Sequence, residues 1–388
     1  MTVPWLGIQK IAVVPTFNAQ FDGPPPPDWD YLVMSRVLYD PDPITGIDRS
    51  LRAYINALSY GQAILNVQQF PHAFSNGPSV IEAAWQSLPS GHDCPYVLCV
   101  IPWADGDSNR IGFFEDVGQN GVVAVSRVAM YDILSIKRRQ ITGVWAMELL
   151  HAMVGWPDLY KANGIKMGDW DNMTYNAGTH SCAHLKLRPG WLAATDIANH
   201  NGGEQNYDLQ SLSIIPPPPG RFAAVRIRST RSGNVFMAEA RLRSDVYERG
   251  FAPQLGGGLE FRGLPGEGVI VYQTHDDLQE TLFMGGPLGV GQTYDNSAEG
   301  FTVSVYQTIE GGMTVRVTMA PDLRSIVPDV FELRPAAAAK LVHDAGLVPK
   351  FTGPNTAHSW VFSQSPAAGH AVAQGSTVTM ALRSGPLP

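Results

Sequence analysis

The sequence predicts an α+β protein of three domains, and three observations support this fold class. The chain has 388 residues, more than one ordinary hydrophobic core accommodates. Residues 216–219 are four consecutive prolines, which is typical of a domain boundary. Short alternating segments follow the prolines, and an alanine-rich helix with flanking strands occupies the C-terminal end. We therefore expect domains at 1–215, 220–322 and 325–388.

The first domain combines strands and helices in the manner of a mixed α/β sheet. Uninterrupted or alternating apolar residues predict strands at 1–20, 63–67, 96–101 and 121–126. Helical patterns are found at 50–58, 78–88 and 140–153, and a polyproline spacer at 24–27. The section 155–210, rich in Gly, Asn, Asp and Trp, is predicted to be irregular.

The second and third domains have different patterns. Alternating strands separated by turn residues predict a β-sandwich, with strands at 223–228, 235–242, 269–274, 301–307 and 313–319. In the third domain, a helix is predicted over 334–345, with Gly346 as its cap, followed by strand, Ser-Pro turn and strand. This pattern predicts a small α+β module.

Charge and hydropathy exclude two classes of partner. The net charge of -8 and the pI near 5.7 argue against nucleic acid, whose binders usually carry a basic stripe. No apolar run approaches the roughly 18 residues of a membrane span. The N-terminal residues predict a strand and not a signal peptide. Either a signal has been removed, or the protein leaves its cell by another route, or it stays inside.

The helix at 140–153 carries a pattern typical of zinc peptidases. In that pattern two histidines four residues apart bind the metal, and the intervening glutamate is the general base. Here Glu148 and His151 are present, but Met147 stands at the position of the first histidine. A thioether is poorly suited to Zn²⁺ among nitrogen and oxygen ligands. Met147 is therefore expected to fill the vacated space, and His151 is either a surviving ligand or a structural histidine.

Three stretches carry a resemblance to a known family. The first contains Glu148, His151, Gly155 and the run Pro157-Asp158-Leu159-Tyr160. The second contains residues 170–175, then His184 and residues 190–192. The third contains Glu239, Arg241 and residues 268–272. In these places the chain resembles the immune-inhibitor-A-type secreted metallopeptidases, which are relatives of the metzincins.

The resemblance implies a metzincin-like α/β peptidase fold and a set of site residues. Asp158 would be the acidic third zinc ligand, Met173 the methionine of the Met-turn, and Tyr175 a catalytic helper or additional ligand. The spacing departs from the family, because one extra residue separates His151 from Gly155 and Asp158. We expect this shift to displace Asp158 and to weaken zinc binding.

Other residues offer alternative metal sites. His180, Cys182 and His184 alternate, so an extended backbone would place them on one face, where they could join His151 in a different site. The acidic loops 105–107 and 169–171 could hold Ca²⁺ through oxygen ligands, or they could be solvated turns.

Residues 327–385 resemble a PASTA domain, the module found in penicillin-binding proteins and bacterial serine/threonine kinases. The matching segments are 327–330, 344–347, 363–366 with Gly369, and 375–379. The resemblance implies either binding to cell-wall peptidoglycan or a spacer role.

These observations predict a degenerate, inactive metallopeptidase-like protein that binds bacterial cell-envelope material. We expect an extracellular, cell-surface or virion-associated location, with assembly partners if the protein belongs to a larger particle. The alternative is an active zinc endopeptidase with Glu148 as general base and an unusual ligand set of His151, Asp158 and a histidine such as His184.

Overall fold

The structure is a computed structural model that describes most of the chain. The described residues are 4–18, 29–42, 44–75, 80–103, 113–116, 122–129, 141–161, 164–175, 178–250, 263–275, 280–319, 324–356 and 358–385. The predictions for 24–27 and for the acidic loop 105–107 lie outside them. The chain divides into two compact units. The larger unit comprises Met1–Ser229, Asn234–Ser297 and Phe301–Thr318, and the remaining residues form the smaller unit.

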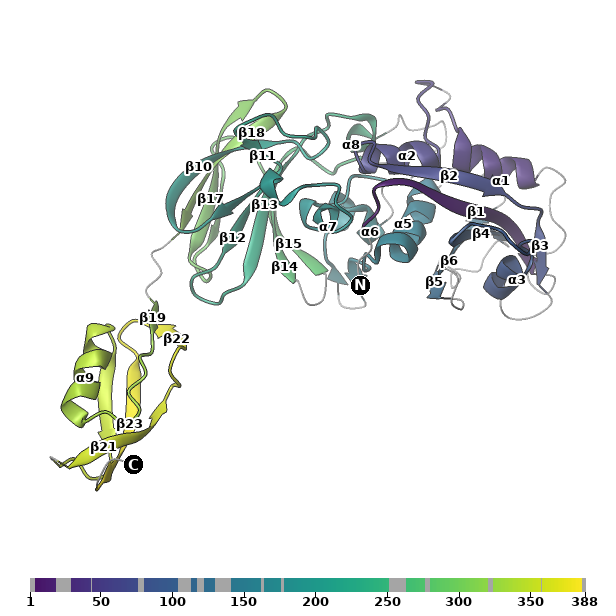
Figure 1. Ribbon diagram of the computed structural model, residues 1–388. Helices are drawn as coiled ribbons and strands as arrows, with labels where there is room; N and C mark the ends of the chain where they lie inside the picture. Colours follow the sequence, from purple (N-terminus) through teal and green to yellow (C-terminus); the bar gives the residue numbers. More distant parts are fainter. Residues whose placement is uncertain are drawn as a thin grey trace. The chain divides into compact units, whose positions relative to one another are not determined.

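A six-stranded mixed sheet forms the first part of the larger unit (Figure 1). Its order is β2-β1-β4-β6-β5, with β3 beside the end of β1. The first four strands of this order are parallel, and β5 is antiparallel to β6, so the predicted mixed pairing is confirmed. The strands are β1 (Gly7–Asn18), β2 (Ala63–Gln69), β3 (Ala73–Ser75), β4 (Tyr96–Trp103), β5 (Phe113–Asp116) and β6 (Val122–Ala129).

Helices cover both faces of this sheet. Helices α1 (Trp29–Leu38), α2 (Leu51–Leu58) and α5 (Ile141–Val154) share one core with Ile11 and Val13 of β1. Helix α3 (Val80–Gln86) shares a second core with Ala12 and Val14. Successive residues of a strand point to opposite faces, so β1 carries apolar side chains at four consecutive positions, 11–14.

The section predicted to be irregular contains short elements. Between residues 155 and 196 they are β7 (Tyr160–Lys161), β8 (Gly164–Ile165), η1 (Gly168–Trp170), α6 (Asn172–Tyr175), α7 (Ala183–Leu187) and η2 (Ala194–Asp196). Each is too short to show a hydrophobic period, so the sequence pattern alone did not reveal them.

Two five-stranded sheets complete the larger unit, and we call them the paired sheets. One has the order β11-β10-β18-β17-β16 and the other β15-β14-β13-β12-β9. They contact each other through Phe236 of β13 and Phe301 of β17, whose ring centroids are 4.9 Å apart. The strands are β9 (Ile197–His200), β10 (Gly203–Gln210), β11 (Arg221–Phe222), β12 (Ala224–Arg228), β13 (Val235–Arg241), β14 (Gly268–His275), β15 (Glu280–Leu288), β16 (Thr293–Asn296), β17 (Phe301–Ile309) and β18 (Gly312–Met319).

Strand β13 is buried along its whole length. Phe236 points toward the opposite sheet, whereas Met237 belongs to the same core as helix α5. The paired sheets therefore pack with one face against the first part of the chain. Strands β9 and β10 also precede the boundary predicted at 216–219, so the paired sheets begin at Ile197.

The smaller unit is a compact α+β module. Strands β20 (Val348–Thr352), β23 (Thr377–Ser384) and β21 (Ser359–Ser365) form a sheet in that order, and β19 (Arg324–Ile326) pairs with β22 (Ala371–Ala373). Helix α9 (Pro335–Asp344) packs on the core through Ala338 and Val342. Proline occupies the first helical position, and Gly346, at a φ of 70°, follows the end of the helix as predicted.

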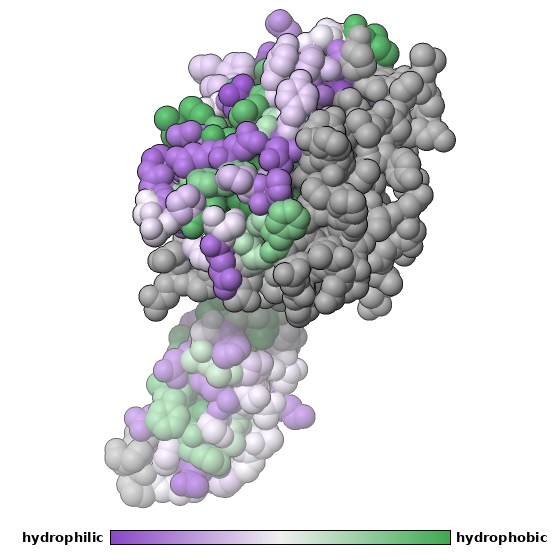
Figure 2. Space-filling model, turned by 90° about the vertical axis from the view of Figure 1, so that its right-hand side faces the viewer, coloured by the Kyte–Doolittle hydropathy of each residue, from purple (hydrophilic) through white to green (hydrophobic). Residues whose placement is uncertain are grey.

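Several large apolar side chains are exposed among the described residues, among them Ile8, Tyr31 and Ile44. On the face in Figure 2, hydrophobic residues in green lie between hydrophilic ones in purple. Single exposed apolar residues are normal for a folded protein. Among the described helices, none is both long and apolar enough to cross a membrane.

Candidate functional site

Helix α5 places three of the predicted site residues near its C-terminal end. Met147 and His151 are four residues apart, so they lie one above the other on the same face. Met147 and Glu148 are each only 2% exposed, whereas the His151 side chain retains 13% exposure. His151 therefore lies at the solvent edge of a buried group.

A tight turn after the helix orients the His151 ring. Gly155 has a φ of 69°, a left-handed conformation that favours glycine, and it reverses the chain at the helix end. The turn brings the Trp156 carbonyl to 2.6 Å from His151 Nδ1. A carbonyl only accepts hydrogen bonds, so Nδ1 carries a proton and donates it. Nε2 is then the nitrogen that is free to bind another group, as in metal-binding histidines.

The same turn brings Asp158 to His151. His151 Nε2 lies 2.9 Å from Asp158 Oδ1, an ion-pair distance. The contact lacks hydrogen-bond alignment, since Oδ1 has no hydrogen-bond partner among the described residues. We treat it as an ion pair, because the interaction of two charges depends on distance more than on angle. The extra residue before Gly155 thus leaves Asp158 within reach of His151. The expected effect of this residue on zinc binding stays a prediction.

Glu148 is the buried carboxyl group of the site. Its Oε2 is buried and has no hydrogen-bond partner among the described residues. Burial raises the pKa of Glu148 to about 7, although the charge of His151 opposes this shift. Burial alone would lower the pKa of His151, but Asp158, Glu148 and the Trp156 carbonyl outweigh it and raise that pKa above its usual value. Such perturbed groups mark candidate functional sites.

The residues present do not complete a catalytic zinc site. Zinc in hydrolytic sites takes three protein ligands and a water molecule. His151 Nε2 and Asp158 Oδ1 converge, but the position of the first histidine holds the Met147 thioether, which is packed in the core with Met153 and Met173. Within the described ranges, no group of three or more His, Cys, Asp or Glu side chains could hold a metal ion.

The segment predicted as the Met-turn lies beside this site. The Leu159 N–H donates to the Met173 carbonyl over 2.9 Å, which joins the segment to the turn after α5. Met173 is fully buried. Both carboxylate oxygens of Asp171 accept backbone N–H groups, from Met173 and Cys182, so this residue anchors the chain. The side chain of Tyr175 lies outside the described residues.

The structure does not assemble the alternative metal site at 180–184. His180 contacts Asp245 through Nε2 at 2.7 Å and Lys186 through Nδ1 at 2.8 Å, so both ring nitrogens are engaged. Burial raises the pKa of the Cys182 thiol well above its usual value, which disfavours the thiolate that binds metals. His184 is buried at the start of α7, where its backbone N–H donates to Tyr272.

Glu239 and Arg241 belong to a buried ionic cluster. Arg241 contacts Glu239 of its own strand at 3.2 Å and Glu248 of helix α8 (Val246–Arg249) at 2.8 Å. It also donates to the carbonyls of Trp170 and His180, in the first part of the larger unit. These side chains therefore connect the paired sheets to the segments around the candidate site.

Sequence reasoning missed two members of this region, Glu248 and Lys186. Lys186 is fully buried, donates to the Leu58 carbonyl at 2.7 Å and lies 4.1 Å from the centre of the Tyr60 ring. Burial lowers its pKa to about 7. A lysine in a short helix gives no signal of burial, because its partners come from distant parts of the chain.

Comparison with known proteins identifies the smaller unit. Residues 325–382 match the family model of the PASTA domain. The smaller unit carries a PASTA domain. This confirms the prediction made from the sequence, and the helix and three-stranded sheet described above form the core of that PASTA domain. PASTA domains suggest binding of peptidoglycan or β-lactams, and they typically lie outside the cytoplasm.

The PASTA match does not extend into the larger unit. No curated protein matches the chain. The metallopeptidase-like character of the larger unit thus stays a prediction that rests on its own residues.

Proposed function

We propose that the protein binds bacterial cell wall through its PASTA domain, and that its larger unit is a metallopeptidase-like scaffold that no longer cleaves peptide bonds. The observation that carries this proposal is the buried Met147 beside the pair of His151 and Asp158. A thioether in place of the first histidine removes one of the three ligands that a catalytic zinc needs.

The surroundings of the site support a retained scaffold. Met173 lies in the core beneath the helix, and the Arg241 cluster links the paired sheets, a β-sandwich in this proposal, to the same region. Cell-wall binding fits an extracellular, cell-surface or virion setting, in which the larger unit presents a binding surface and the PASTA domain contacts peptidoglycan.

One observation favours the rival function, an active zinc endopeptidase. His151 presents Nε2 toward Asp158, and the Glu148 carboxyl group has an oxygen without a hydrogen bond among the described residues. Glu148 would then act as the general base, at a pKa suited to proton transfer near neutral pH.

Zinc content and peptidase activity separate the two functions. We expect the wild-type protein to purify without stoichiometric zinc and to leave a casein substrate intact. Stoichiometric zinc together with chelator-sensitive cleavage, lost in Glu148→Gln, would establish the peptidase instead.

Substitution of Met147 by histidine tests the metal site directly. If the scaffold is retained, Met147→His supplies the missing imidazole, and the variant should bind about one zinc ion per chain by elemental analysis. Met147→Leu is the matched control, because it keeps the apolar volume and adds no ligand. A histidine variant that binds no more zinc than the leucine variant would show that the two remaining ligands are not positioned for a metal.

A sedimentation assay tests the role of the PASTA domain. We expect the full chain to co-sediment with purified peptidoglycan and a chain without residues 325–388 to remain in solution. If both chains co-sediment equally with peptidoglycan, the PASTA domain has a spacer role. The zinc content of the Met147 variants does not depend on this result.

A further inference from the structure

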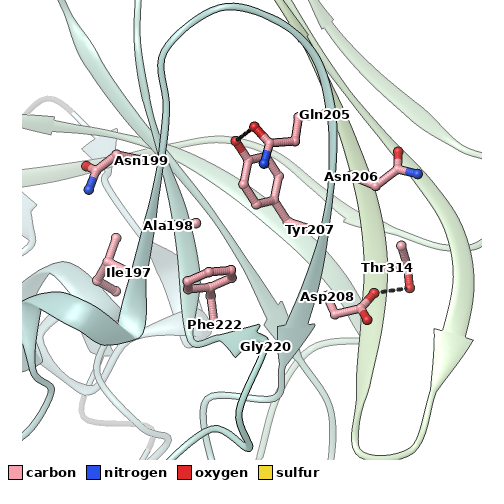
Figure 3. A pocket seen from close by; sticks show the side chains of 10 residues that line it. All are labelled: Ile197, Ala198, Asn199, Gln205, Asn206, Tyr207, Asp208, Gly220, Phe222 and Thr314. Carbon is pink, nitrogen blue, oxygen red and sulfur yellow. Dashed lines mark hydrogen bonds between the residues drawn. The ribbon is translucent and has the colours of Figure 1, made fainter.

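A pocket of about 610 Å³ lies on the paired sheets, beside β9, β10, β11 and β18 (Figure 3). Tyr207 and Asp208 are successive residues of β10, so their side chains point to opposite faces of the strand. Tyr207 packs against Phe222, with 6.3 Å between the ring centroids. Asp208, on the other face, accepts a hydrogen bond from Thr314. These side chains do not face one ligand, so we assign no ligand to this pocket.

The sheet of the PASTA domain, in contrast, has a face on which side chains of one kind gather. Helix α9 packs on the other face, against a core that includes Val378 and Leu382 of β23 (Figure 1). Alternate residues of a strand point to opposite faces, so Arg383 points away from the helix. On β20, Phe351 packs against the core, which places Lys350 on the side opposite the helix. We call this side of the sheet the open face.

Two cations lie on the open face. Lys350 is exposed, and its side chain has no hydrogen bond or ion pair with another described residue. Arg383 is also exposed, and its guanidinium carbon lies 4.5 Å from the centre of the Phe362 ring. A guanidinium stacked on a ring keeps its N–H groups available to an anion. Hydroxyl groups fill the rest of the open face, from Thr352, Ser363, Ser365, Thr377 and Thr379.

The other charges of the PASTA domain do not neutralise these two cations. Residues 325–388 have four Lys or Arg and three Asp or Glu residues, a net charge of +1, although the whole chain carries -8. The three carboxylates all lie within 329–344, in α9 and the segment before it. Asp344 forms an ion pair with Lys340 of the same helix. Among the described residues, neither Lys350 nor Arg383 has a carboxylate partner, so the open face is suited to an acidic ligand.

The spacing of the two cations indicates how dense the charge of this ligand is. Lys350 pairs with Thr379 in the register of the sheet, and Arg383 is four residues farther along β23. At about 3.3 Å per residue and about 4.8 Å between strands, their Cα atoms are roughly 14 Å apart. A polymer with a phosphate in every repeat would keep most of its charges uncompensated here. A mostly uncharged polymer with occasional carboxylates would meet both cations and the hydroxyl groups between them.

We infer that the open face binds peptidoglycan through the carboxylates of its peptide stems, with Lys350 and Arg383 as their partners. This inference rests on the proposed binding of cell wall and adds the surface and the ligand groups. Arg383 can hold a carboxylate by two parallel hydrogen bonds, whereas Lys350 acts as a point charge. Conversion of the stem carboxylates to amides removes the negative charge at nearly the same volume. The affinity of the protein for the wall therefore depends on the amidation of the peptide stems.

Co-sedimentation of the full chain with increasing amounts of peptidoglycan tests the inference. The peptidoglycan is first stripped of phosphate-bearing polymers and then used in two forms, with free carboxylates and with chemically amidated ones. Amidation should weaken binding of the wild type about tenfold, a result that does not depend on any variant. On the form with free carboxylates, Lys350→Gln and Arg383→Gln should each raise the apparent Kd about threefold, and the double variant about tenfold. On the amidated form, the variants should bind like the wild type.

Lys340→Gln is the matched control, because it removes the same charge from the exposed surface of α9. It should leave both affinities unchanged. Equal binding of the wild type to the two forms, or equal binding of the wild type and the double variant to the free form, would overturn the inference and leave cell-wall binding in place. If the wild type binds neither form, the inference and the proposed binding of peptidoglycan are both wrong. The melting temperature of the PASTA domain in each variant shows that the open face is still folded.

Discussion

At the residue scale, the balance of charge around His151 is the feature with the clearest consequences. Glu148 is nearly fully buried, and the positive charge of His151, which Asp158 also contacts, favours its charged form. Two carboxylates thus share one histidine. Burial raises the pKa of Glu148, because the charged form of its carboxyl group loses hydration.

We predict that replacing Glu148 makes the larger unit less sensitive to pH. Its pKa rises from 4.5 in the unfolded chain to about 7 in the folded protein. Between these values the unfolded chain releases its proton first, so rising pH favours unfolding by up to about 3 kcal/mol. The pKa of His151 is also raised, so its stabilising contribution is present at low pH and is lost as pH rises through the folded pKa. The raised pKa values of Glu148 and His151 therefore both make the folded protein less stable as pH rises.

Thermal unfolding at pH 5, 6.5 and 8 measures this effect. The Glu148→Gln variant should become progressively more stable than the wild type as pH increases. The exposed Glu310→Gln serves as the control and should show no such trend. A difference between Glu148→Gln and wild type that stays constant over this pH range would contradict the shifted pKa.

At the scale of elements, strand β13 holds the two parts of the larger unit together. One of its faces contacts the opposite sheet, and the other contributes to the core around α5. Its last residue, Arg241, joins two buried glutamates and two carbonyls from the first part of the chain. A buried charge is tolerated only when its partners are all present.

We predict that Arg241→Met destabilises the larger unit by about 4 kcal/mol, because it leaves Glu239 and Glu248 buried without their cation. Urea denaturation monitored by tryptophan fluorescence measures the change. The same substitution at Arg228, which is exposed on the neighbouring strand β12, should change stability by less than about 0.5 kcal/mol. Similar effects at both positions would mean that the cluster contributes little to the joining of the two parts.

At the scale of the whole molecule, the division into two units predicts independent unfolding. The PASTA domain has its own core, which includes Val342, Val361 and Met380 and shares no residue with the cores of the larger unit. A small domain with a separate core unfolds cooperatively by itself.

We predict that Val361→Ala lowers only one of two thermal transitions. The substitution leaves a cavity that costs about 2 kcal/mol, which in a domain of this size corresponds to roughly 10 °C. Calorimetry of the full chain should show the transition of the PASTA domain displaced and that of the larger unit unchanged. Parallel displacement of both transitions would indicate that the units unfold together.

The elements that the sequence predicted well were recognised from patterns within a few consecutive residues. Continuous apolar runs predicted β1 and β4, and alternation predicted β12–β14, β17 and β18. The glycine that follows α9, Gly346, marked its C-terminal end. The sequence did not predict helix α1, nor strands β3, β5, β9, β10, β15 and β16. Strands of this kind are specified by their pairing more than by their own residues.

The sequence by itself determined the PASTA domain, the helix that carries Glu148 and His151, and the presence of Met147 where a ligand is expected. Only the tertiary structure decided that Asp158 reaches His151, that His180 pairs with Asp245 and Lys186, and that Arg241 joins the paired sheets to the first part. The physical reason is the range of the interactions. Helix periodicity and capping act over a few residues, whereas the partners of buried charges come from segments that only the complete fold brings together.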